Sequence, residues 1–302
     1  MSIALLPVFG VVVIGLGLRR IKFPGDAFWP YSDRLTYFVL FPALLINKLA
    51  TANLNRPELL PMLGVLCLSI VVISVVVWLV RPLMPGSNAS YTSVLQGSIR
   101  PNTYIGLAGA STLLGTDGLA LLAVALAIVI PLVNVISVLG FARWVPRNSP
   151  NIARVVRSIL TNPLIVACVV GLLLNFSGIG LPLGLSSITT IMGQAALPMG
   201  LLSVGAGLQV RTLGQHWQLL TVSSLLKLVV LPLLAFGLGT FFSVDRLALS
   251  VAVLYTCLPC SVSSYTLAAE LGGDKTLIAA IITIQTLLAM LSIPLLLEAT
   301  VL

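Results

Sequence analysis

Arg100 is the one charge in a long apolar stretch of the chain, residues 88–113. It lies about twelve residues into that stretch, which is mid-depth if the stretch crosses a membrane. A cation there costs roughly 2.5–3.5 kcal/mol, so it needs a partner or a function, and the sequence offers no obvious acidic partner at that depth. Two roles stay open. The planar guanidinium is suited to bind the carboxylate of an anionic substrate, or it binds backbone carbonyls of another broken helix and locks two helices together.

Prolines with polar neighbours occur at two places where a membrane helix would be expected, at Pro101 and Pro259. Proline removes a backbone donor and clashes with the carbonyl four residues earlier. Such breaks are tolerated in a membrane only where protein or a water-filled cavity satisfies the freed backbone. Two matched breaks predict a binding site near the midplane, and the half-helix N-termini that follow them favour an anion. The candidate substrate-binding residues are Arg100, Asn102, Thr103, Ser261 and Ser263, and Pro101, Pro259 and Cys260 mark the crossover of the breaks.

Two more mid-span amides, Asn134 and Gln285, occupy corresponding segments of the two halves of the chain. They are candidate substrate ligands, with hydrogen bonding between helices as the alternative. Lys227 is about nine residues into its apolar segment. We expect its amine to snorkel to the membrane surface or to pair with Glu270 rather than to bind substrate.

The composition predicts a helical membrane protein. Of the 302 residues, 58% are hydrophobic and 8% are charged, against about 25% charged in soluble domains. One span takes about 20 apolar residues, so the chain holds roughly ten. The predicted spans are about 2–18, 31–50, 60–81, 88–113, 118–142, 161–179, 185–209, 218–241, 246–270 and 275–298. We expect one membrane domain with no soluble domain.

The basic residues predict the orientation. With the first connection in the cytoplasm, eleven Lys and Arg fall on the cytoplasmic side and only Lys48, Arg56 and Arg246 on the other. The positive-inside rule then places both termini outside and the connection 143–160 in the cytoplasm. The basic residues are scattered between apolar runs, so the net charge of +8 does not indicate a nucleic-acid-binding site.

An internal repeat relates the two halves. Markers recur at an offset of 156–158 residues: Pro7 and Pro163, Gly15 and Gly171, Pro42 and Pro198, Pro101 and Pro259. Each half holds five predicted spans, so the second half enters the membrane upside down. The sequence therefore predicts a 5+5 inverted repeat, with repeat 1 at about 1–142 and repeat 2 at about 161–302, an architecture of secondary transporters.

The sequence shows no nucleotide-binding motif and no residue pair for intramembrane catalysis. We expect no enzyme activity, no cofactor and no metal centre. A non-transporting sensor or assembly component is the alternative function. It is disfavoured because no soluble module or long charged tail accompanies the spans.

Three strings resemble a known family. Arg100-Pro-Asn102-Thr-Tyr-Ile-Gly106 resembles the R-x-N-x-x-x-G signature in the fourth span of the auxin efflux carrier family, which includes plant auxin exporters and bacterial permeases for malonate and related carboxylates. Phe41-Pro42-Ala-Leu-Leu45 resembles the second span of that family, and Asn162-Pro163-Leu-Ile the sixth. The ten-span layout matches over essentially the whole chain, and the short central connection is similar to that of bacterial members.

The resemblance implies an elevator transporter, similar in fold to the bile acid:sodium symporters. Helices 2–50 and 161–209 would form a scaffold and a homodimer interface, and helices 60–142 and 218–298 would move, with the substrate beside the crossing of spans 4 and 9. We therefore expect secondary active or facilitated transport of a small organic anion, a mono- or dicarboxylate such as malonate or an auxin-like acid, in a cell (inner) membrane. Sodium, a proton or no coupling ion all stay open.

Overall fold

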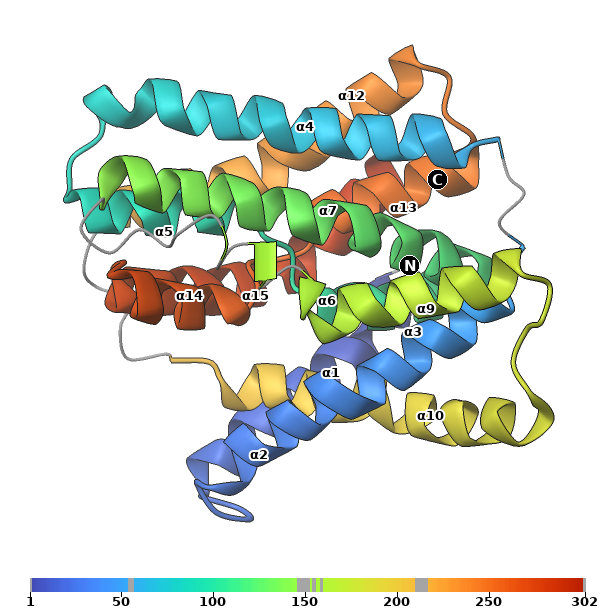
Figure 1. Ribbon diagram of the computed structural model, residues 1–302. Coiled ribbons are helices and arrows are strands. Elements are labelled where there is room, and N and C mark those ends of the chain that lie inside the picture. Colours follow the sequence, from blue (N-terminus) through green and yellow to red (C-terminus); the bar gives the residue numbers. More distant parts are fainter. Residues whose placement is uncertain are drawn as a thin grey trace.

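The protein is all-helical. The computed structural model describes residues 2–53, 57–145, 153, 156–157, 160–209 and 217–300, and the regular secondary structure in these ranges is helical (Figure 1). The prediction of an all-α fold is therefore confirmed. Most of the central connection predicted at 143–160, and the basic residues Arg56, Arg147, Arg154 and Arg211, lie outside the described residues.

Helix is present in each of the ten predicted segments. The first half contains α1 (Ser2–Arg20), α2 (Phe28–Leu35), the π-helical turn η1 (Thr36–Leu40), α3 (Phe41–Ala50), α4 (Leu59–Val80), the short 3-10 turn η2 (Arg81–Leu83), α5 (Asn88–Ile99), α6 (Thr103–Leu113) and α7 (Gly115–Trp144). The second half contains α9 (Pro163–Phe176), α10 (Leu183–Ala206), α11 (Trp217–Leu225), the π-helical turn η5 (Leu226–Val230), α12 (Leu231–Phe241), α13 (Arg246–Cys257), α14 (Ser263–Leu271) and α15 (Lys275–Thr300).

Within the described ranges, five helices are long and apolar enough to cross a membrane by length and composition. They are Leu59–Leu83, Gly115–Trp144, Gly184–Ala206, Trp217–Phe241 and Lys275–Thr300. The multi-pass character is thus supported, while the full count of ten spans and the inverted repeat stay predictions.

Prolines shape the helices in two ways. Before Pro42 and Pro232 the backbone takes one π turn, in which the N–H of Phe41 bonds to Thr36 and that of Leu231 to Leu226, and the helix continues. Such a turn accommodates the carbonyl that the proline ring displaces. At Pro101 and Pro259 the chain instead leaves the helix, because α5 ends at Ile99 and α13 at Cys257. The two predicted breaks are therefore observed.

The helices pack in two groups. One consists of α1, α2, α3, α9 and α10, with close contacts between α1 and α10 and between α3 and α9. The other consists of α4–α7 and α11–α15, which surround the two breaks and lie above α1, α2 and α10 in Figure 1. A Cβ on Gly205 of α10 would collide with the carbonyl of Val12 on α1, so glycine is required for this close crossing. Movement of one group past the other stays a prediction.

Candidate functional site

The two broken helices meet at their breaks. Pro101 and Cys260 form an isolated antiparallel bridge, and the N–H of Asn102 donates to the carbonyl of Pro259 at 2.8 Å. Each extended segment thus satisfies backbone groups that the other leaves unpaired. The arrangement puts the ends of α5 and α13 and the starts of α6 and α14 around one point, which we call the crossing.

Gln285 of α15 holds the crossing from one side. Its Oε1 accepts from the N–H of Cys260 at 2.9 Å, and its Nε2 donates to the carbonyl of Gly97 at 3.1 Å and to Oγ of Ser223 at 3.3 Å. Gly97 is four residues before Pro101, so its carbonyl is the one that the proline ring displaces. One amide therefore satisfies both broken helices. Gln285 is fully buried and does not line the cavity described next, so the structure does not bring it to the other candidate residues.

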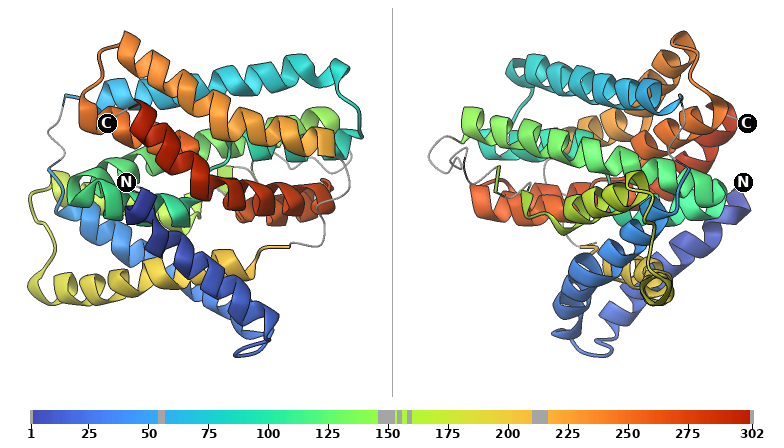
Figure 2. Two further views of the ribbon diagram at one scale, coloured as in Figure 1. Left: turned by 180° about the vertical axis from the view of Figure 1, so that it is seen from behind. Right: turned by 45° about the vertical axis from the view of Figure 1, so that its right-hand side comes forward.

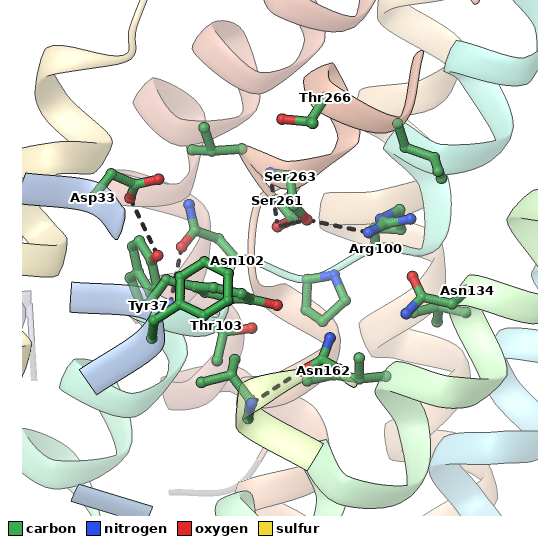
Figure 3. A pocket seen from close by; sticks show the side chains of 18 of the residues that line it. Asp33, Tyr37, Arg100, Asn102, Thr103, Asn134, Asn162, Ser261, Ser263 and Thr266 are labelled. Carbon is green, nitrogen blue, oxygen red and sulfur yellow. Dashed lines mark hydrogen bonds between the residues drawn. The ribbon is translucent and has the colours of Figure 1, made fainter. Parts of the chain in front are cut away.

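A cavity of about 520 Å³ lies beside the crossing, between the two groups of helices. Figure 3 shows side chains of both groups around it. Of the sequence-predicted residues, the structure brings these to its wall: Arg100, Pro101, Asn102, Thr103, Asn134, Ser261 and Ser263. Pro259 and Cys260 lie behind the wall, where Cys260 is fully buried. The predicted residues of the first break, the second break and α7 therefore share one cavity.

Arg100 links the two broken helices and has one donor without a partner. The residue is only 8% exposed. Its Nη2 donates to Oγ of Ser263 at 3.1 Å, which ties the first broken helix to the start of α14. Its Nη1 is buried with no hydrogen-bond partner among the described residues. A buried charged donor without a partner is costly, which makes Nη1 a candidate donor to a ligand.

Asn102 combines a structural and an open role. Its Oδ1 accepts from the N–H groups of Tyr104 and Ile105 at 3.1 and 3.3 Å, so it caps the N-terminus of α6 as asparagine commonly does. Its Nδ2 is buried and, in this part of the structure, also lacks a partner. Asn102, which lines the same cavity, therefore holds a second buried donor without a partner.

The start of α14 is built from serines. Oγ of Ser261 accepts from the N–H of Ser263 at 3.3 Å and lies 2.8 Å from its Oγ. These hydroxyls line the cavity between Asp33 and Arg100 in Figure 3. The N-terminal ends of α6 and α14 thus both border the cavity, and helix N-termini favour negative charge.

Sequence reasoning missed residues that the first group of helices contributes. Asp33 of α2 accepts from the hydroxyl of Tyr104 at 3.2 Å, and the ring of Tyr104 stacks on Phe41 at 4.6 Å between centroids. Tyr37 of η1 and Asn162, whose Oδ1 caps α9, also line the cavity. From the second group, Thr266 and Glu270 of α14 also line the cavity. The sequence feature that could have indicated this contribution is the carboxylate of Asp33, near the start of the predicted span 31–50.

The described ranges hold no group of three or more His, Cys, Asp or Glu side chains that could bind a metal ion. The charged groups at the cavity wall are Arg34, Arg100, Asp33 and Glu270. Of these, Arg100 is the one beside the crossing, and Asp33 lies on the other side of the view in Figure 3. The site can bind and orient a polar ligand through hydrogen bonds and charge.

Comparison with known proteins identifies relatives that are membrane transport proteins. A family model described as membrane transport protein matches residues 1–297. An uncharacterized transporter from Methanothermobacter thermautotrophicus is 31% identical over 146 residues, which is 47% of this chain and 47% of that protein. The aligned part thus spans about half the length of this relative. The resemblance noted from the motifs is confirmed, since the chain belongs to the membrane transport protein family, the family of the auxin efflux carriers.

Proposed function

We propose that the protein carries a small organic anion, a mono- or dicarboxylate, across the membrane. The observation that supports this most is the pair of buried donors without partners, Nη1 of Arg100 and Nδ2 of Asn102, at one cavity. A carboxylate accepts from two such donors at once, and charge-assisted bonds of this kind are the stronger ones. The N-termini of α6 and α14 add to the same preference.

The packing supports an elevator mechanism as part of the proposal. The cavity lies between the two groups of helices, and its anion donors all belong to the second group. In this mechanism the helices of 60–142 and 218–298 carry the anion past a scaffold formed by 2–50 and 161–209. A homodimer joined through the scaffold, an inner-membrane location and both termini outside complete the proposal.

The alternative of a sensor or assembly component is less well supported. A membrane sensor without transport has no need for a polar cavity with unused donors between two helix groups. We therefore keep transport as the single proposed activity, with Na⁺, a proton or no ion as the open coupling choices.

The test is charge movement by purified protein on a solid-supported membrane. Malonate, malate, lactate and indole-3-acetate are applied in turn. We expect a current for at least one acid, a loss of it in Arg100→Ala, and partial retention in Arg100→Lys, because lysine keeps the charge but not the fork. Arg143→Gln, at an exposed residue at the end of α7, is the matched control and should behave as wild type. A current that survives Arg100→Ala unchanged would contradict the anion role of Arg100.

A further inference from the structure

Lys227 is a buried cation that the anion site does not use. Its side chain is fully buried, and its Nζ has no hydrogen-bond partner anywhere in the described part of the chain. The expectation that it snorkels or pairs with Glu270 is wrong. Glu270 lines the cavity, and Lys227 is enclosed within the second group of helices. Burial of an unpaired ammonium is costly, so its position needs a physical reason.

The reason lies in what surrounds Lys227. Its π turn η5 packs against α5, α13 and α15. Of these, α5 and α13 end at the crossing, at Ile99 and Cys257. Ser223, one turn before Lys227, lies against Gly97 near the end of α5, and the turn η5 that contains Lys227 also contacts α13. Lys227 therefore lies where two half-helices end, whereas the cavity lies where two half-helices begin.

The two sides of the crossing have opposite electrical character. Helix N-termini carry partial positive charge and helix C-termini partial negative charge. In carriers with discontinuous helices, the C-terminal ends and unwound carbonyls are where coupling cations such as Na⁺ or H⁺ bind, while N-termini face anionic substrate groups. In this protein the side of the crossing where α5 and α13 end already contains a positive charge, the ammonium of Lys227, which is part of the chain.

We propose that the ammonium of Lys227 is a tethered cation that takes the place of a diffusible coupling ion behind the crossing, so that the carrier binds no Na⁺ there and needs none. The transport part of this statement rests on the proposed function. The ion-binding part does not, because it concerns the C-terminal ends of α5 and α13 alone.

Hydroxyl groups on the preceding turn of helix could serve a free cation if the lysine were removed. Ser223 and Ser224 of α11 are buried four and three residues before Lys227, and Oγ of Ser224 has no hydrogen-bond partner in the described structure. Both offer oxygen, the ligand atom that alkali and other hard cations prefer. Removal of the ammonium should therefore leave a polar vacancy that a small cation fills.

The experiment measures thermal unfolding of the purified full chain in NaCl, LiCl, KCl and choline chloride at equal ionic strength. Wild type and Lys227→Arg should unfold at the same temperature in all four salts. Lys227→Gln should be destabilised in choline chloride and regain stability with Na⁺ or Li⁺, by about 3–6 °C at ten times the dissociation constant. Lys275→Gln, at an exposed residue, controls for loss of a lysine and should show no salt specificity.

Each outcome decides the proposal. Ion-specific stabilisation of Lys227→Gln, or its recovery as folded protein only when Na⁺ or Li⁺ is present, supports the tethered cation. The same unfolding temperature of Lys227→Gln in every salt, its failure to fold in every salt, or specific stabilisation of wild type by Na⁺ overturns it.

Once a transported acid is identified, wild-type flux should be the same with and without Na⁺ or proton gradients. A requirement for either gradient would also overturn the proposal. The unfolding measurements need no substrate, so they stand even if none of the tested acids is carried.

Discussion

At the scale of single residues, the two polar atoms of the Asn102 side chain are in different situations. One amide oxygen holds the first turn of α6, and the nitrogen of the same amide is buried without a hydrogen-bond partner in the described structure. A substitution by aspartate separates the helix cap from the proposed anion contact, because aspartate keeps the oxygen that caps α6 and removes the N–H donor.

We predict that Asn102→Asp folds with little loss of stability and loses anion transport by at least about tenfold. Aspartate caps helices as well as asparagine does and is favoured near an N-terminus, while its second oxygen repels a carboxylate in place of donating to it. Thermal unfolding and substrate-induced current measure the two effects separately.

Asn102→Ala is the comparison variant, because it removes both functions. It should lose transport and also about 0.5–2 kcal/mol of stability through the missing cap. Wild-type transport by Asn102→Asp would show that Nδ2 does not face the anion.

Gln285 shows how far residue types alone can be interpreted. The sequence places a polar amide in the last apolar segment, and both a ligand role and a structural role fit such a residue. The structure uses all of its hydrogen-bonding atoms at the crossing, which supports the structural role. The partners Gly97 and Cys260 are 188 and 25 residues away, and no local pattern in the sequence links them.

At the scale of elements, Tyr104 connects the two groups of helices. It belongs to α6, yet its hydroxyl donates to Asp33 of α2 and its ring stacks on Phe41 of α3. Any movement of α6 past α2 must separate these contacts. A hydrogen bond to a charged group contributes about 1.5–3 kcal/mol, enough to affect the rate of such a step.

We predict that Tyr104→Phe, which keeps the stacked ring and removes the hydroxyl, raises turnover by up to about tenfold. The half-saturating substrate concentration should change by less, because the anion donors are untouched. Currents recorded over a range of substrate concentrations give both quantities.

Tyr31→Phe, at an exposed tyrosine of the same helix as Asp33, is the control and should leave both quantities unchanged. A fall in turnover together with thermal stability would indicate that Tyr104 serves packing rather than restraint of movement.

The elements themselves were largely predictable. Apolar runs and prolines locate helix in every predicted segment and locate both breaks, because these features act through local backbone chemistry. The contribution of α2 and α9 to the cavity was not predictable in the same way. Asp33, Tyr37 and Asn162 reach the cavity only through packing of the two groups, which depends on contacts such as that between Gly205 and α1.

At the scale of the whole molecule, the orientation in the membrane is open to a direct test. The marked ends of the chain lie on the same side of the molecule in both views of Figure 2. The four native cysteines are buried or half-buried, so a cysteine introduced at an exposed position should react with a membrane-impermeant maleimide over a low background.

We predict that Ser177→Cys is labelled from outside intact cells and that Ala27→Cys is labelled only after the membrane is opened. Both residues are exposed and lie between helices, Ser177 after α9 and Ala27 before α2. The excess of basic residues on the side of Ala27 is the physical reason. The reverse pattern of labelling would invert the orientation, and labelling of both from outside would contradict the span count between them.

In the proposed elevator mechanism, the two buried cations also make transport sensitive to membrane voltage. Arg100 and Lys227 belong to the same group of helices, so in the proposed movement both charges cross part of the electric field together. A bound carboxylate neutralises one of them, and the empty carrier therefore moves more positive charge than the loaded one. The field acts on each elementary charge with about 2.3 kcal/mol per 100 mV. In that mechanism, a negative cell interior draws the empty site toward the cytoplasm.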